Sequence, residues 1–226
     1  MAYNLLKGKK GLVFGALNEQ SIAWKVAQRA VEEGAEIVLT NTPVSIRMGT
    51  IDELAQACNA PVIAADATSV KDLENLIDQT MEHFGGKFDF ILHSIGMSPN
   101  VRKGRTYDDL DYDYLAKTLD ISAISFHKVI QVARKKDAIN DWGSIVALTY
   151  IAAQRTLYGY NDMADAKAVS ATSTAVKSAY ASIPSRSRPP RPRPARAYWA
   201  WKTCSTTQNA FPRWATLRPT TVPATC

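Results

Sequence analysis

Cysteine is scarce in this sequence of 226 residues, and long apolar runs are missing altogether. Cys58, Cys204 and Cys226 are far apart and odd in number, which disfavours a disulfide framework or a zinc site and favours reduced thiols in a cytoplasmic protein. No apolar run reaches the roughly 18 residues that a transmembrane helix needs, and the N-terminus lacks the apolar stretch of a signal peptide. We therefore expect no membrane partner and no metal site.

Acidic residues and glycine are absent from the last quarter of the chain. Residues 169–226 contain nine Lys or Arg, eight of the 11 prolines and three of the five tryptophans. Residues 1–168 contain 18 basic and 21 acidic residues, so the tail supplies the whole excess of the net charge of +6. We therefore divide the chain into a globular domain, residues 1–168, and a Pro- and Arg-rich tail, residues 169–226, that we expect to be disordered.

Short apolar segments alternate with amphipathic ones along the first 168 residues. We predict strands at 10–14, 36–40, 61–64, 88–93 and 144–148, and helices at 21–33, 51–58, 70–84, 108–121 and 123–136. Apolar strands that alternate with helices are typical of a parallel sheet covered on both faces. The predicted fold class is therefore α/β, with a doubly wound parallel sheet, and such sheets bind ligands beyond the carboxyl ends of their strands.

Small residues follow the first and fourth predicted strands, where a ligand is expected. Gly15 ends the first strand, and Ser21 and Ile22 begin the next helix. Backbone N–H groups and the dipole at such a helix start favour an anion such as a pyrophosphate. The loop has one glycine and then five residues before Ser21, so it is not the G-x-G-x-x-G motif. Ser94 and Ile95 follow the fourth strand and come to the same edge of the sheet.

Asp66 and Ala67 follow the third predicted strand. The Asp66 carboxylate is suited to accepting a hydrogen bond from an adenine amine. The alternative is structural, because Asp66 could instead be the N-cap of the helix that begins at Val70. Neither alternative is favoured by the sequence around it.

Two tyrosines and a lysine stand out in the stretch TYIAAQRTLYGYNDMADAKA, residues 149–168. Lys167 follows Tyr160 by seven residues, which on a helix places both within roughly 20° of one face. A phenol there can donate to a developing oxyanion, and the ammonium favours the phenolate and can hold a neighbouring hydroxyl. Tyr150 lies at the end of the fifth predicted strand. The alternative is an amphipathic helix with a solvated lysine.

The segments GLVFGALNEQSIAW, AADAT, HSIGMSPN and TYIAAQRTLYGYNDMADAKA together resemble the bacterial NADH-dependent enoyl-acyl-carrier-protein reductases. These belong to the short-chain dehydrogenase/reductase superfamily, whose ordinary members have the shorter spacing Tyr-x3-Lys. The resemblance covers residues 1–168 and implies a Rossmann-like fold. It also implies the reaction, hydride transfer from NADH to the double bond of a trans-2-enoyl thioester in fatty-acid elongation.

The resemblance assigns roles to particular residues. It implies cofactor contacts for Gly15, Ser21, Ile22, Asp66, Ala67, Ser94, Ile95 and Lys167, a substrate contact for Ser98, and catalytic roles for Tyr150, Tyr160 and Lys167. Tyr160 would donate to the thioester oxygen as an enolate develops, and Lys167 would hold the nicotinamide ribose hydroxyls. The resemblance further implies enoyl-acyl-carrier protein as substrate, a cytoplasmic homotetramer, and no nucleic-acid or membrane partner.

After Ala168 the sequence departs from this family, whose C-terminal strands and helices are missing or scrambled here. The tail can also be read in an offset frame, in which the third base of each codon is joined to the first two bases of the next. In this frame the codons of residues 198–203 are compatible with L-G-M-E-N, with some letters forced and others permitted, and this sequence is similar to the family. We therefore predict a small deletion and a frameshift after Ala168, and the activity of this particular chain is left open.

Two other functions are compatible with the sequence. One is a different short-chain dehydrogenase/reductase acting on a small carbonyl compound, although the Tyr-x6-Lys spacing disfavours it. The other is a non-catalytic protein that binds a nucleotide, or nucleic acid through the basic tail.

Overall fold

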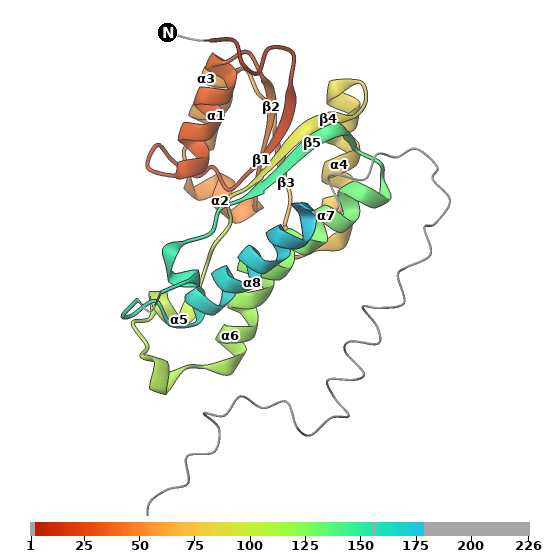
Figure 1. Ribbon diagram of the computed structural model, residues 1–226. Coiled ribbons are helices and arrows are strands. Elements are labelled where there is room, and N and C mark those ends of the chain that lie inside the picture. Colours follow the sequence, from red (N-terminus) through yellow and green to blue (C-terminus); the bar gives the residue numbers. More distant parts are fainter. Residues whose placement is uncertain (1–2, 156, 179–226) are drawn as a thin grey trace, which may run out of the picture. The chain divides into compact units, whose positions relative to one another are not determined.

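The computed structural model describes residues 3–155 and 157–178, with side chains as far as residue 171 (Figure 1). The expectation that disorder begins at residue 169 is wrong, because residues 169–178 continue a helix. The rest of the predicted tail, with Cys204 and Cys226, lies outside this description. In the described part of the chain, no helix is both long and apolar enough to cross a membrane.

Five parallel strands form one sheet. They are β1 (Lys10–Phe14), β2 (Glu36–Asn41), β3 (Val62–Ala64), β4 (Phe88–His93) and β5 (Ile139–Ala147), in the spatial order β3-β2-β1-β4-β5. The chain moves outward from β1 to β3 and then returns to β4 on the other side of β1. This reversal makes the carboxyl ends of β1 and β4 the topological switch point, where ligands bind in such sheets.

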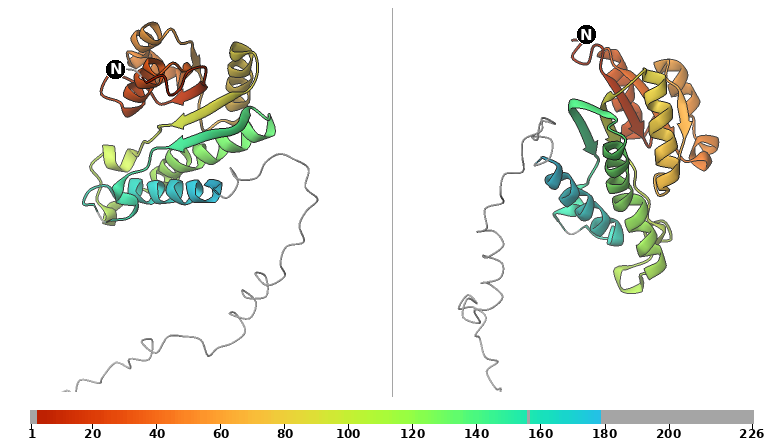
Figure 2. Two further views of the ribbon diagram at one scale, coloured as in Figure 1. Left: turned by 45° about the horizontal axis from the view of Figure 1, so that its top comes forward. Right: turned by 90° about the vertical axis from the view of Figure 1, so that its right-hand side faces the viewer.

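Helices cover both faces of the sheet, as the sequence predicts (Figures 1 and 2). The helices are α1 (Ile22–Glu32), α2 (Pro43–Met48), α3 (Ile51–Cys58), α4 (Val70–Phe84), α5 (Pro99–Arg102), α6 (Tyr112–Leu119), α7 (Ser125–Lys135) and α8 (Asn161–Ser178), with 3-10 turns at Tyr107–Asp109 and Ile151–Ala153. One apolar core lies between the sheet and α1 and α3, and a second lies between the sheet and α4 and α7. The Rossmann-like α/β class is therefore confirmed.

Most predicted boundaries agree with the structure, but β5 begins earlier than the predicted residue 144. Ile139 already pairs with Phe88, and the register then shifts before Ser144 pairs with Phe90. Trp142 has a φ of 66° within this irregular segment, which interrupts the alternation of apolar and polar residues. The sequence pattern therefore indicates only the regular half of the strand.

The predicted helices at 108–121 and 123–136 are shorter in the structure and are joined without a break. Asp120–Ile124 forms a π-helical turn between α6 and α7. Within this turn, Ser122 Oγ donates to the carbonyl oxygen of Met97 at 3.0 Å and accepts from the Met97 N–H at 2.9 Å. The turn therefore ties the helix to the segment that follows β4, at the switch point of the sheet. Turns of this kind are frequent at functional sites.

Two short helices are missing from the sequence prediction, although each begins with a hydroxyl N-cap followed by proline. Thr42 Oγ1 accepts from Ser45 N at the start of α2, with Pro43 next to it. Ser98 similarly caps α5, and Pro99 follows. A hydroxyl N-cap with proline at the first helical position is a recognised start signal, and it could have revealed both helices.

Candidate active site

The main chain comes unusually close together where β1 and β4 end. Gly15 has a φ of 86°, and a Cβ atom on it would lie 2.0 Å from the carbonyl oxygen of Ser94. Only glycine fits both the backbone conformation and this contact. The structure therefore brings together two predicted cofactor contacts, and half-buried Ile95 follows directly.

The loop after Gly15 is braced by the hydroxyl of Ser21. This hydroxyl donates to Asn18 O at 2.7 Å and accepts from Leu17 N at 3.3 Å, and it does not cap α1. The first N–H groups of α1 are thus not used by the Ser21 side chain, as an anion site at this helix start requires. Ile22, in the first turn, is 62% exposed.

Asp66 lies half-buried after β3, but it is not the N-cap of α4. Its Oδ1 atom accepts from both Thr68 N and Thr68 Oγ1 at 2.8 Å. Ser69 is the N-cap instead, and its hydroxyl accepts from Asp72 N. The N-cap alternative for Asp66 is therefore wrong, because Ser69 lies next to the helix start and takes that position. Ala67 is buried beside it.

Lys167 is buried, so the alternative of a solvated lysine is wrong. Only 8% of the residue is exposed. Its Nζ atom donates to Ile95 O at 3.0 Å and to Leu148 O at 3.1 Å, just after β4 and β5 end. Burial lowers the pKa of this amine because the charged form loses water. An ammonium has three N–H donors, so one remains beyond these two carbonyls.

Tyr150 and Tyr160 form an aromatic pair. Their ring centroids are 4.9 Å apart at an interplanar angle of 41°. Tyr150 is 44% exposed and Tyr160 is half-buried. The pair joins the end of the fifth strand to the start of α8, so two of the residues with predicted catalytic roles are neighbours.

The pKa of the Tyr160 phenol is raised, so the expected stabilisation of the phenolate by Lys167 does not determine its net shift. Burial, and secondly the neighbouring Tyr150, raise the pKa of Tyr160 above its ordinary value. The helical-face argument also changes, because α8 begins at Asn161 and Tyr160 lies just before it. Tyr160 is thus held as a neutral phenol, which is the form that can donate a hydrogen bond.

Ser98 has its hydroxyl directed into the protein. Its Oγ atom donates to Asp162 Oδ1 at 2.7 Å and accepts from Val101 N at 3.0 Å. The residue is buried. A substrate contact at this position would therefore use the main chain and not the hydroxyl. Asp162 itself was missed by the sequence analysis, because a single acid in the first turn of a helix normally indicates a solvated side chain.

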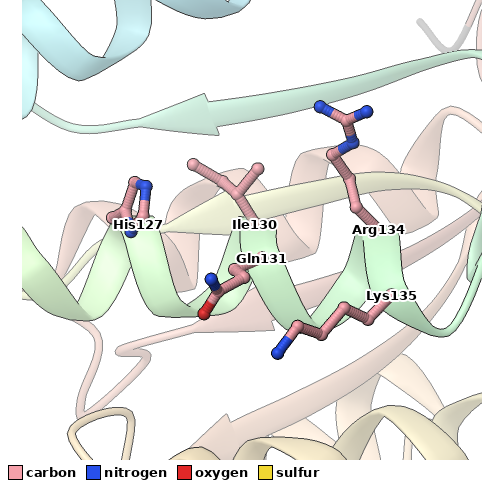
Figure 3. A pocket seen from close by; sticks show the side chains of 5 residues that line it. All are labelled: His127, Ile130, Gln131, Arg134 and Lys135. Carbon is pink, nitrogen blue, oxygen red and sulfur yellow. The ribbon is translucent and has the colours of Figure 1, made fainter.

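A cavity of about 290 Å³ lies elsewhere, along one face of α7 (Figure 3). It is lined by His127, Ile130, Gln131, Arg134 and Lys135. None of these is among the predicted site residues, and the cavity supplies no support for the predicted chemistry. Among the described residues, no group of three or more His, Cys, Asp or Glu could hold a metal ion.

Comparison with known proteins identifies the family. A family model described as "Enoyl-(Acyl carrier protein) reductase" matches residues 15–181, which include every predicted site residue from Gly15 to Lys167. This chain belongs to that family. Its members supply close matches in both sequence and structure.

Three relatives illustrate the match. The Rhizobium meliloti protein named "Enoyl-[acyl-carrier-protein] reductase [NADH] 1" is 37% identical over 169 residues, which cover 74% of this chain and 60% of that protein. The crystal structure of FabI from Alistipes finegoldii is 88% identical, with a TM-score of 0.74, and the match covers 76% of this chain and 66% of that one. A FabI–NADH complex from the same organism matches with the same identity and TM-score over 75% and 60%. The chain thus spans about 60% of the Rhizobium relative.

Proposed function

We propose that this chain binds NADH at the carboxyl ends of β1, β4 and β5 and catalyses hydride transfer to the double bond of an enoyl thioester carried by acyl carrier protein. The observation that carries this proposal is the buried Lys167 amine, bonded to Ile95 O and Leu148 O at the switch point of the sheet. The names of the relatives and the NADH complex of the Alistipes finegoldii protein support the choice of cofactor and substrate.

The residues present fit NADH. The lack of a Cβ at Gly15 allows its backbone to lie close to that of Ser94, and the N–H groups at the start of α1 would bind the pyrophosphate. Asp66, half-buried after β3, would accept from an adenine amine. The remaining N–H of Lys167 can donate to a ribose hydroxyl. When bound, NADH supplies the hydride.

Tyr160 would act on the substrate. Its phenol is protonated at neutral pH, and the raised pKa favours this form further, so it would donate to the thioester oxygen as negative charge develops there. One such donor is worth about 2.7–4 kcal/mol of transition-state stabilisation. Tyr150, whose ring contacts that of Tyr160 and is partly exposed, would line the acyl site. The substrate contact at Ser98 would come from its main chain.

Titration of the full chain with NADH, followed by nicotinamide fluorescence, tests the cofactor site. Lys167→Ala should weaken binding about tenfold to a hundredfold, because a charge-assisted hydrogen bond contributes about 1.5–3 kcal/mol. Lys136→Ala is the matched control, since Lys136 pairs with Asp78 at the far end of α7 and should leave the affinity unchanged. Equal affinities of the parent and Lys167→Ala would contradict the proposal.

An enoyl-thioester reduction assay on the same preparations tests the reaction, and Tyr160→Phe should lower kcat more than NADH affinity. The homotetramer, the cytoplasmic location and the frameshift after Ala168 stay predictions. Reading the coding DNA across codons 165–226 would test the last of these, since the offset frame must then continue without a stop codon.

A further inference from the structure

The carboxylate of Asp162 is fully buried in the first turn of α8. Its Oδ1 atom accepts from Ser98 Oγ at 2.7 Å, and its Oδ2 atom accepts from Asn100 Nδ2 at 2.9 Å and from Thr118 Oγ1 at 2.7 Å. All three donors are neutral. A buried carboxylate is costly unless its oxygens are bonded in this way, and the start of a helix adds favourable partial positive charge.

The donors belong to one stretch of chain that folds around the start of α8. Asn100 is itself fixed, because its Nδ2 donates to Asp111 O and its Oδ1 accepts from Asp111 N, both at 3.1 Å. Asn161, next to Asp162, donates through Nδ2 to Arg105 O. Two consecutive residues of α8 are therefore tied to the segment 98–118.

The residue before this hydrogen-bonded turn belongs to the candidate active site. Tyr160 immediately precedes Asn161, and its carbonyl oxygen accepts from Met163 N at 3.1 Å. Asn161 has a φ of 35°, a left-handed conformation that sets the direction in which Tyr160 leaves the helix. The hydrogen bonds of the Asp162 side chain fix the first turn of α8, which directly follows Tyr160. Lys167, one and a half turns further along, is held separately by β4 and β5.

We propose that Asp162 is a positioning residue for Tyr160, and that Ser98, Asn100 and Thr118 act through it. The buried carboxylate fixes the first turn of α8, and this places the Tyr160 ring against Tyr150 and aims the phenol into the site. The significance of this placement rests on the proposed function, in which Tyr160 is the donor. The placement itself can be measured without cofactor or substrate.

The placement of the Tyr160 ring against Tyr150 can be measured by nuclear magnetic resonance of the full chain with 13C-labelled tyrosine rings. Tyr150→Phe and Tyr160→Phe assign the two ring signals, whose positions include the ring-current effect of the 4.9 Å contact. In Asp162→Ala both signals should lose this effect and move toward the signal of the exposed Tyr158. Parental positions for both signals in folded Asp162→Ala would overturn the proposal.

Matched variants separate positioning from general loosening. Glu33→Gln alters another buried carboxylate, which accepts from Tyr3 N and Leu5 N far along the chain from the tyrosine pair, and it should leave both ring signals unchanged. If Asp162→Ala does not fold, Thr118→Val removes a single donor and should move the signals less but in the same direction. Unchanged signals in Thr118→Val would then overturn the proposal. Failure of NADH to bind would contradict the proposed function alone.

Discussion

The sheet and the region around α8 are stabilised by different chemistry. The sheet is held by apolar burial, with Leu12, Leu39 and Leu76 all inaccessible or almost so. Helix α8 is held by buried polar groups, namely Asp162 with its three donors in the first turn and Lys167 with its two carbonyls further along. Apolar burial is non-directional, whereas hydrogen bonds fix atoms in particular positions. The catalytic candidates therefore lie where the protein specifies geometry most closely.

The largest effect should come from the apolar region. Leu39→Ala removes a side chain with 0% exposure from the core beneath α1 and α3. We expect the free energy of unfolding to fall by about 2–5 kcal/mol, measured by urea denaturation, because the lost burial is compounded by a cavity. NADH affinity of the folded variant should stay close to that of the parent. A loss of NADH affinity in fully folded Leu39→Ala would contradict the view that the apolar core and the region around α8 act separately.

A smaller loss of stability should follow a change in the polar region. Thr118→Val leaves Asp162 Oδ2 with one donor fewer, which should lower the free energy of unfolding by about 1–3 kcal/mol. The same denaturation experiment measures it. Thr118→Val should therefore be more stable than Leu39→Ala. The contrast between the two regions is supported if Thr118→Val nevertheless shifts the ring signals of Tyr150 and Tyr160 more than Leu39→Ala does. Larger shifts of these ring signals in Leu39→Ala than in Thr118→Val would contradict the contrast.

The smallest effect should appear in the pH dependence of Lys167. Burial lowers the pKa of Lys167, so between that pKa and the ordinary value of 10.5 the unfolded chain binds more protons than the folded one. Stability conferred by this residue therefore increases as pH rises through that window. We expect the unfolding free energy of the parent to increase relative to that of Lys167→Met as the pH rises through this window, measured by urea denaturation at several pH values. Tyr160, whose raised pKa acts in the opposite sense, is present in both proteins and cancels.

The sequence predicts the apolar region well and the polar region poorly. The bounds of β1, β4, α3 and α4 agree with the structure because apolar periodicity and helix start or stop signals report local burial. Asp162 could not be found in this way, since its partner Ser98 is 64 residues away in the sequence. The spacing from Tyr160 and the resemblance to a family both point to Lys167, but only the structure shows that its amine is buried and bonded to two carbonyls.

The π-helical turn at Asp120–Ile124 has a consequence for insertions and deletions in this part of the chain. Such a turn contains an extra residue relative to a regular α-helix. Deleting one residue there would leave a regular α-helical turn and keep the orientation of α7 relative to α6, whereas a deletion within α7 would rotate the rest of that helix by about 100°. Phe126 and Val129, which follow the turn, would then keep their buried positions. The loss of a single codon should therefore be tolerated better in this turn than within α6 or α7.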